Sequence, residues 1–225
     1  ICSRGEYLDP NKSYPSDCPA NTPIRTITLA QRQLILKKIN TYRHKTACGF
    51  VNNLPKARRM RVLKWNTELA KLAALNAGQC KMSHDTCRNT AAFKYSGQNI
   101  FMEWNSGVID VTKSLTKAID LWFAENKVTT ATNIASYPAT TTAVIGHFTA
   151  LVQDRSTEVG CGYILWTANS LNYIVVTCNF ASTNIIGYPV YKKGTKAGGG
   201  CKFKSTTYKC LCGVKEPINP NTLIK

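Results

Sequence analysis

Ten cysteines in 225 residues are the feature that most restricts what this chain can fold into. No Cys-x-x-Cys pair is matched by a second such pair or by a His-x-His spacing, which argues against a zinc module. An even number of cysteines in a chain of this length fits a set of disulfides formed in an oxidising compartment. The cysteine pattern therefore predicts a secreted, extracellular protein.

Composition divides the chain into three parts. Residues 1–27 contain cysteines, prolines and turn formers, which predict an arm held by disulfides. Residues 28–190 form the predicted domain, and residues 191–225 are a lysine-rich, cysteine-containing extension. The chain begins with Ile1 and has no apolar run of membrane length, so we expect a processed monomer without a membrane span. Asn11-Lys12-Ser13 is a glycosylation sequon, and whether Asn11 is glycosylated stays open.

Periodicity predicts helices first and strands later. Thr28 and Gln31 form a capping box, and further helices are expected from Asn66 to about Cys80 and from near Asp110 to Phe123. Continuous β-branched runs at 159–167 and 172–180, joined by a short turn, predict a pair of strands. Cys161 and Cys178 lie on these neighbouring strands and are expected to form a disulfide. The order of the elements predicts an α+β fold with a mainly antiparallel sheet.

The formal net charge of +17 predicts attraction to anionic partners, such as sulfated glycans, acidic lipids or cell surfaces. The densest cluster lies between two predicted helices and is either a solvated loop or an anion-binding patch: Lys56, Arg58, Arg59, Arg61 and Lys64. No aromatic residues interleave with these charges, and the expected compartment is extracellular. Nucleic acid is therefore not an expected partner.

Several stretches together carry a family resemblance. Gly146-His147-Phe148-Thr149 with Val152, and Val176-Thr177-Cys178-Asn179-Phe180, resemble the signature motifs of the CAP superfamily of cysteine-rich secretory, antigen-five and pathogenesis-related proteins. Cys80 to Arg88 and Gly97-Gln98-Asn99-Ile100 extend the resemblance, which covers residues 28–190. The chain is most similar to the insect antigen-five branch, in particular the tablysin type of horsefly saliva.

The resemblance implies a CAP domain, which is a three-layer α-β-α sandwich with an antiparallel sheet. It would stand between a disulfide-stapled N-terminal arm and a C-terminal extension. The resemblance also implies that disulfides tie the arm to the segment that holds Cys80 and Cys87. The pairing of the remaining cysteines stays open: Cys48, Cys201, Cys210 and Cys212.

In CAP domains two histidines and two acidic residues line a central cleft, and the matching positions here are His84, Gln98, Glu125 and His147. Gln98 departs from the family, which often has Glu there, because glutamine can neither supply a charge nor act as a base. We expect the sheet to hold the ring of His147, since the short apolar segment that it opens leads directly into the strands. His44 is expected to be solvated.

The cleft offers a base but no identifiable nucleophile or oxyanion site. The sequence contains no Gly-x-Ser-x-Gly, His-Glu-x-x-His or catalytic-cysteine signature, so we expect a binding protein that is not an enzyme and requires no cofactor. Two imidazoles and a carboxylate could still hold zinc at His84 and His147. The alternative is a metal-dependent hydrolase that uses His84, Glu125 and His147.

The tripeptide Arg4-Gly5-Glu6 resembles the Arg-Gly-Asp sequence that integrins recognise, and Cys2 and Cys18 bracket it. Horsefly antigen-five proteins carry such a tripeptide in an N-terminal loop. The additional methylene of Glu6 moves the carboxylate by about one bond length, which spoils coordination of the integrin metal ion. We therefore predict weak or absent integrin binding, and the sequence leaves open whether Glu6 is natural or engineered.

Several CAP proteins, the horsefly type among them, bind fatty acids or eicosanoids such as leukotrienes in an apolar channel between helices. Apolar side chains expected on and beside the helices are the channel candidates, although most must be core: Ile35, Ile39, Tyr42, Trp65, Leu121 and Trp122. The leading hypothesis is a protein that sequesters a small carboxylated lipid. A further alternative is an allergen or ion-channel modulator that acts through its basic surface.

Overall fold

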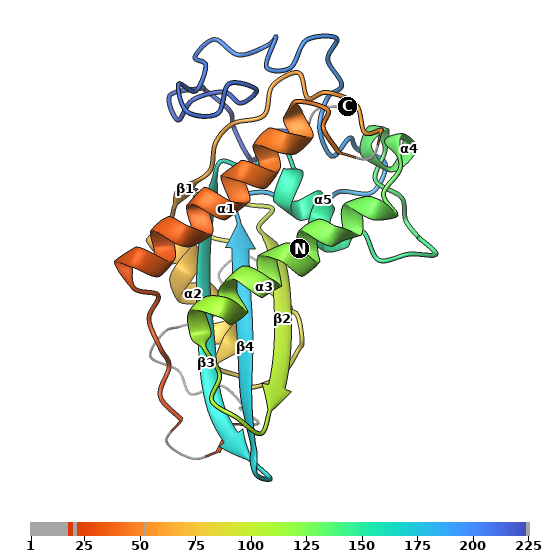
Figure 1. Ribbon diagram of the computed structural model, residues 1–225. Coiled ribbons are helices and arrows are strands. Elements are labelled where there is room, and N and C mark those ends of the chain that lie inside the picture. The colour runs from red at the N-terminus through yellow and green to blue at the C-terminus, as the bar shows by residue number, and fades with distance from the viewer. Residues whose placement is uncertain (1–17, 20–21, 52, 224–225) are drawn as a thin grey trace.

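The computed structural model describes residues 18–19, 22–51 and 53–223 of the chain (Figure 1). The Arg-Gly-Glu tripeptide and the sequon lie outside these residues. The centre of the fold is a four-stranded sheet with the strand order β1-β3-β4-β2.

A long hairpin forms the middle of this sheet. Strands β3 (Glu158–Ala168) and β4 (Leu171–Phe180) pair antiparallel, and the turn residues Asn169 and Ser170 have φ values of 49° and 61°. A two-residue turn with both φ angles positive matches the twist of the strands that it joins. Strand β2 (Gly97–Asn105) pairs antiparallel with β4, and the short β1 (Lys64–Trp65) pairs parallel with β3. The hairpin confirms the predicted strands, whereas the sequence did not predict β2.

The longer helices begin at the predicted capping residues. Thr28 and Gln31 form the capping box of α1 (Leu29–Ala47), and the side chains of Asn66 and Asp110 accept backbone N–H groups of the following turns. Those N–H groups have no partner within the helix, so the caps fix where each helix starts. The capped helices are α2 (Thr67–Ala77) and α3 (Val111–Ala124). Shorter elements follow: η1 (Glu125–Lys127), α4 (Ala131–Ala135) and α5 (Gly146–Val152).

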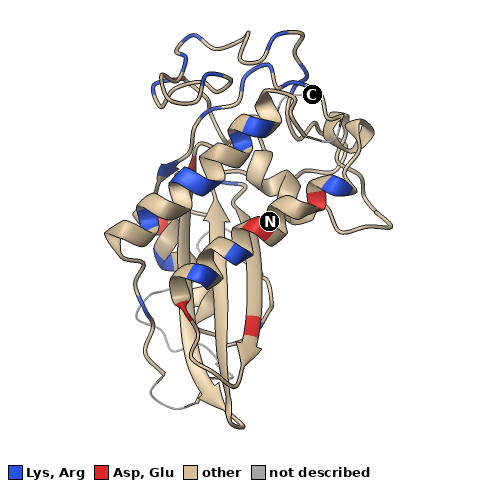
Figure 2. Ribbon diagram, viewed as in Figure 1, with Lys and Arg blue, Asp and Glu red and all other residues tan. Residues whose placement is uncertain are grey.

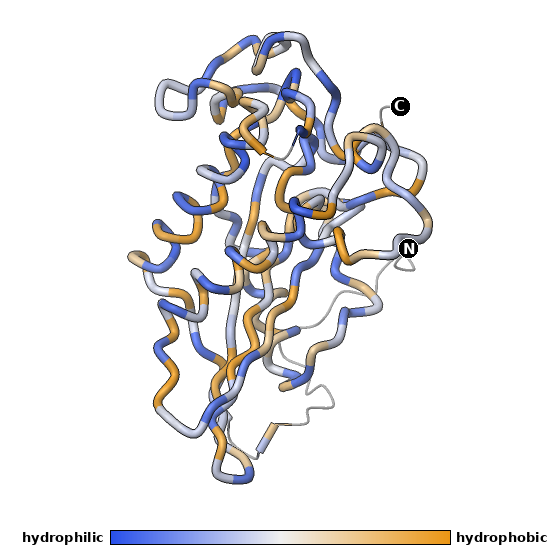
Figure 3. Tube along the Cα trace, turned by 45° about the vertical axis from the view of Figure 1, so that its right-hand side comes forward, coloured by the Kyte–Doolittle hydropathy of each residue, from blue (hydrophilic) through white to orange (hydrophobic). Residues whose placement is uncertain are grey.

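The helices cover both faces of the sheet. Helix α2 packs directly on β3, because Gly162 has no side chain: a Cβ there would lie 2.4 Å from the Cα of Ala74. Ala77 of α2 and Ile164 of β3 belong to a small core on this face. The main core lies on the other face, beneath α1, α3 and α5 (Figures 1 and 3). This arrangement is the predicted three-layer α-β-α sandwich.

Disulfides connect the sandwich to its flanking segments. Cys161 and Cys178 join β3 to β4, as predicted. Cys18 is bonded to Cys80, which lies just after α2, as the family resemblance implied. Cys87 is also disulfide-bonded.

The C-terminal segment, residues 191–223, contains turns and isolated bridges but no helix or strand in its described part. The disulfide between Cys48 and Cys210 fastens it to the end of α1, and Cys201 and Cys212 close a loop within it. Lys and Arg are frequent along α1 and in this segment (Figure 2). In the described part of the chain, no helix has both the length and the apolar character that crossing a membrane requires.

Candidate functional site

The predicted cleft residues meet at the start of β2, which is an edge strand. Gln98 contacts the ring of His84, and the next residue, Asn99, donates from Nδ2 to the backbone carbonyl of His147 over 3.0 Å. Adjacent residues of one strand therefore position both histidines. The strand therefore places the Gly97-Gln98-Asn99-Ile100 motif in the site.

His84 is exposed, and its Nδ1 lies 2.8 Å from Oε1 of Gln98. Nε2 of Gln98 donates to Oδ2 of Asp85 over 2.8 Å and to Oδ1 of Asn179 over 3.0 Å, which orients the amide. Because an amide oxygen only accepts, Nδ1 of His84 donates this hydrogen bond. Asp85, which the sequence analysis missed, thus supplies the negative charge beside the position that is often Glu in CAP domains.

The ring of His147 is held by Glu125, whereas β2 contacts the backbone carbonyl of this residue, so the expectation that the sheet holds the ring was wrong. Oε1 of Glu125 lies 2.5 Å from Nδ1 of His147, and Oε2 accepts the backbone N–H groups of His147 and Phe148, each over 2.9 Å. The segment expected to lead straight into a strand is instead helix α5, and Glu125 caps its first turn. The indole of Trp122 stacks beside the ring, with centroids 6.2 Å apart.

Both imidazoles are bonded through Nδ1, which leaves each Nε2 as a possible metal ligand. Acceptors that orient metal-binding histidines in this way are common around zinc, which usually takes three or four protein ligands. Among the described residues, His84 and His147 belong to no group of three or more His, Cys, Asp or Glu whose ligand atoms lie within 4.8 Å of one another. Two imidazoles alone are fewer protein ligands than a zinc site usually has.

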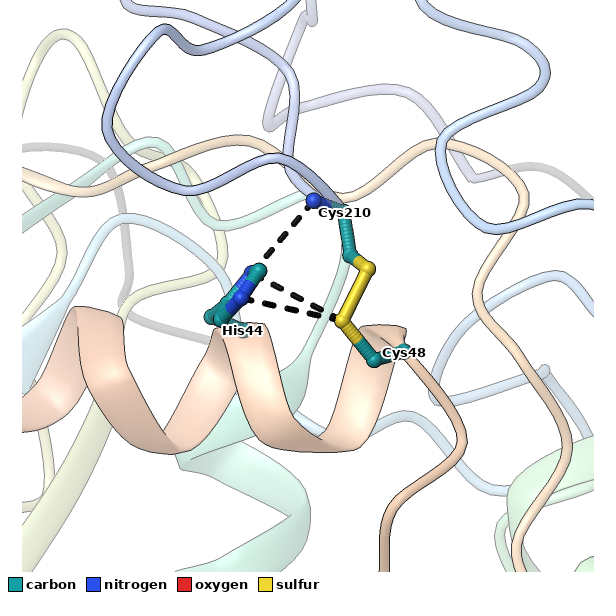
Figure 4. Close-up of side chains that lie close together, drawn as sticks. All are labelled: His44, Cys48 and Cys210. Atoms are coloured by element: carbon teal, nitrogen blue, oxygen red, sulfur yellow. Dashed lines mark hydrogen bonds between the residues drawn. A yellow bond between two sulfur atoms is a disulfide. The ribbon is translucent and has the colours of Figure 1, made fainter.

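One group that meets this criterion consists of His44, Cys48 and Cys210 (Figure 4). The two cysteines form a disulfide, so neither offers the thiolate that binds a metal. Nδ1 of His44 accepts the backbone N–H of Cys210 over 3.4 Å, and the ring lies against Sγ of Cys48. His44 was expected to be solvated but is half-buried, and burial lowers its pKa. This group therefore stabilises the attachment of the C-terminal segment.

The candidate channel residues lie in different environments. Three are buried in the main core: Ile35, Ile39 and Trp122. The ring of Tyr42 stacks on Phe123 with centroids 3.8 Å apart, and its hydroxyl bonds to Asp120, so it closes the contact between α1 and α3. Leu121 is 49% exposed. Trp65 lines an apolar groove on the other side of α1.

This groove, called here the N-terminal groove, has a volume of about 400 Å³ and lies between residues 24–27, α2 and β3. Its apolar lining includes Ile24, Ile27, Trp65, Ala74 and Leu75. Arg25, Arg32 and Lys71 also line it, and its lining includes no acidic residue from the part of the chain that the structure describes. The guanidinium of Arg32 lies over the Trp65 ring, 5.3 Å from its centroid. The groove thus combines an apolar surface with cationic groups.

The fold and the paired histidines define a CAP domain, and comparison with known proteins agrees. The family model described as "CAP: Cysteine-rich secretory protein family" matches residues 36–180, and this chain belongs to that family. Venom allergen-1 of Aedes aegypti is 33% identical over 226 residues, covering 97% of this chain and 87% of that protein. Tablysin 15 of Tabanus yao is 33% identical over 210 residues, covering 93% and 82%.

Among solved structures, that of NaASP2 with Zn²⁺ is similar, with a TM-score of 0.70 and 27% sequence identity. The match covers 87% of this chain and 99% of that chain. These comparisons confirm the insect antigen-five resemblance and the fold class that the sequence predicted.

Proposed function

We propose that this chain is a secreted CAP protein of the salivary or venom type that sequesters a small carboxylated lipid without turning it over. The N-terminal groove is the observation that carries this proposal. Its volume of about 400 Å³ lies within the range of small-molecule pockets. The disulfides and the insect relatives support an extracellular location.

The charges around the groove favour a carboxylated ligand over a neutral one. Arg25, Arg32 and Lys71 line the groove, and none of the described residues that line it with them is acidic. Nε of Arg32 is buried and has no hydrogen-bond partner among the described residues. A carboxylate that accepts from this guanidinium would satisfy the donor while the acyl chain covers Ile24, Trp65 and Leu75.

The histidine cleft favours binding over catalysis. Both oxygens of Glu125 accept hydrogen bonds from α5 residues, and Gln98 is a neutral amide, so the base that the cleft offers is an imidazole Nε2. A hydrolase would also require a nucleophile or an activated water and an oxyanion site, and the sequence motifs identify neither. The cleft residues instead join α3, α5 and β2.

Calorimetry with a long-chain fatty acid and with a leukotriene tests the proposal. We expect about one lipid per chain and expect that Ile24→Asp and Arg32→Ala weaken binding at least tenfold, since they introduce or remove charge at the groove. Lys37→Ala is the matched control, because Lys37 is exposed on α1 and does not line the groove. Absence of heat with both lipids would refute the proposal. Binding unaffected by both groove variants would exclude the N-terminal groove as the binding site.

Zinc binding is the second candidate, favoured by the free Nε2 atoms of His84 and His147. Zinc should survive dialysis in the parent chain and be lost in His147→Ala, as measured by atomic absorption. His44→Ala is the control, because His44 packs against a disulfide. Equal zinc content in the parent chain and His147→Ala would contradict this assignment.

A further inference from the structure

A second cavity, called here the extension cavity, lies on a different part of the molecule. It has a volume of about 490 Å³ and forms where the C-terminal segment meets residues 58–59 and the loop between α5 and β3. Its charged lining residues are Arg58, Arg59, Asp154, Arg155, Lys192 and Lys202. One segment of the predicted basic cluster, the loop between α5 and β3 and the extension thus converge on one cavity.

Backbone hydrogen bonds hold this cavity together. The N–H of Arg58 donates to the carbonyl of Lys192 over 2.8 Å, and the carbonyl of Arg58 accepts from Gly200 over 2.8 Å. The N–H of Lys192 donates to Oδ2 of Asp154 over 2.9 Å. Since residues from three separate parts of the chain are fixed by main-chain bonds, the charged groups are gathered before any ligand arrives.

Acidic groups neutralise only part of the positive charge. Nε of Arg59 lies 2.6 Å from Oε1 of Glu216, so that guanidinium has an ionic partner. Asp154 is the acidic residue that lines the cavity. Arg58, Arg155 and Lys202 also line the cavity, so its lining carries excess positive charge.

Arg155 is the decisive residue. It is only 5% exposed, yet Nε and both terminal nitrogens have no hydrogen-bond partner among the described residues. Arg43, which is equally buried, donates to four backbone carbonyls, and Arg61 donates to the carbonyl of Thr157 over 2.9 Å. Buried guanidinium groups are expected to have such partners. Asp154 attracts the Arg155 guanidinium electrostatically but accepts no hydrogen bond from it, so all its donors remain available to a bound anion.

We propose that the extension cavity binds the phosphate or sulfate ester group of a small molecule, with Arg155, Arg58 and Lys202 as its donors. The planar fork of arginine matches a tetrahedral oxyanion. No aromatic residue of the described chain lines the cavity, so these residues offer no surface on which a nucleobase could stack. The proposal is independent of the lipid groove, which lies between other elements.

Thermal unfolding and calorimetry at constant ionic strength test this site. The probes are inorganic phosphate, inorganic sulfate and a trisulfated heparin disaccharide, with chloride as the reference anion. We expect saturable binding that the double variant Arg58→Ala with Lys202→Ala weakens roughly tenfold or more. Lys209→Ala is the matched control, since it is an exposed lysine of the same segment that does not line the cavity.

Arg155→Met should remove the stabilisation by the anion while leaving the chain folded, because no hydrogen bond is lost. If Arg155→Met does not fold, the test rests on the double variant Arg58→Ala with Lys202→Ala, because both of these residues are exposed. Tighter binding of the disaccharide than of inorganic sulfate would assign the site to sulfated glycans. Tighter binding of inorganic phosphate than of inorganic sulfate would assign it to phosphate esters. A non-saturable effect, or one equal in parent, double variant and Lys209→Ala, would overturn the proposal.

Discussion

Nε2 of Gln98 donates a hydrogen bond to Oδ2 of Asp85 over 2.8 Å, so the amide and the carboxylate at the centre of the histidine cleft are matched to each other. The carboxylate that CAP domains often carry on β2 is here provided by the residue after His84. The loss of a charge at position 98 is therefore compensated within the same site.

Gln98→Glu should destabilise the protein at neutral pH, because it would bring two carboxylates to hydrogen-bonding distance in a buried position. We expect a loss of about 1–3 kcal/mol in the free energy of unfolding at pH 7. The repulsion raises the folded-state pKa of the pair, so the loss should shrink as the pH falls toward 4. Urea unfolding measures it, and Asp85→Asn in the same chain should restore stability. A stable Gln98→Glu single variant at neutral pH would contradict this matching.

Arg43 and Arg155 provide a matched pair of buried arginines. Arg43 is fully buried and donates to the carbonyls of Arg61, Leu151, Gln153 and Ser156 over 2.8–3.3 Å. Arg43→Met would leave these buried carbonyls without donors and should cost about 3–5 kcal/mol. Arg155→Met should change stability by less than about 1 kcal/mol or increase it. Chemical denaturation of both variants checks the difference, and equal losses would show that hydrogen bonding does not distinguish the two sites.

His44 should make the attachment of the C-terminal segment sensitive to acid. Burial lowers the pKa of this histidine from its usual value of 6.5, so the folded protein binds the proton less readily than the unfolded chain. Stability is therefore complete above the unfolded pKa and is lost as the pH falls through the folded-state pKa. The melting temperature should drop between about pH 7.5 and about pH 5 in the parent chain and less in His44→Gln. The same drop in both proteins would rule out His44 as the cause.

The Arg4-Gly5-Glu6 prediction can be tested by one substitution. Glu6→Asp shortens the side chain by one methylene and should create or restore blockade of cell adhesion to integrin-coated surfaces, because the shorter carboxylate reaches the metal ion. Arg4→Ala with Glu6→Asp is the control for dependence on the tripeptide. A Glu6→Asp variant as inactive as the parent chain would exclude this loop as an integrin ligand.

Local signals in the sequence predicted the parts of the fold that depend on local interactions. The caps at Thr28, Asn66 and Asp110 fix helix starts within one turn, and the hairpin follows from adjacent β-branched runs. Helix α5 was missed because it has only seven residues and no side-chain cap of its own. Its cap comes from Glu125, which lies far outside the local pattern.

The site could be predicted only in part for the same reason. Family motifs identified His84, Gln98, Glu125 and His147, but their pairing depends on β2 and on the end of α3. In the sequence, Asp85 resembles any polar loop residue. Its role is visible only in the fold, where β2 places Gln98 beside it. Likewise, Arg155 in the sequence is one cation among many, and only its burial without a hydrogen-bond partner distinguishes it.

Fluorescence quenching by a brominated fatty acid tests lipid capture in the N-terminal groove most directly, because Trp65 lines the groove and Trp122 does not. We predict saturable quenching at about one lipid per chain in the parent protein, its disappearance in Trp65→Phe and its retention in Trp122→Phe. Quenching that persists in Trp65→Phe, or none in the parent protein, would contradict binding at this groove.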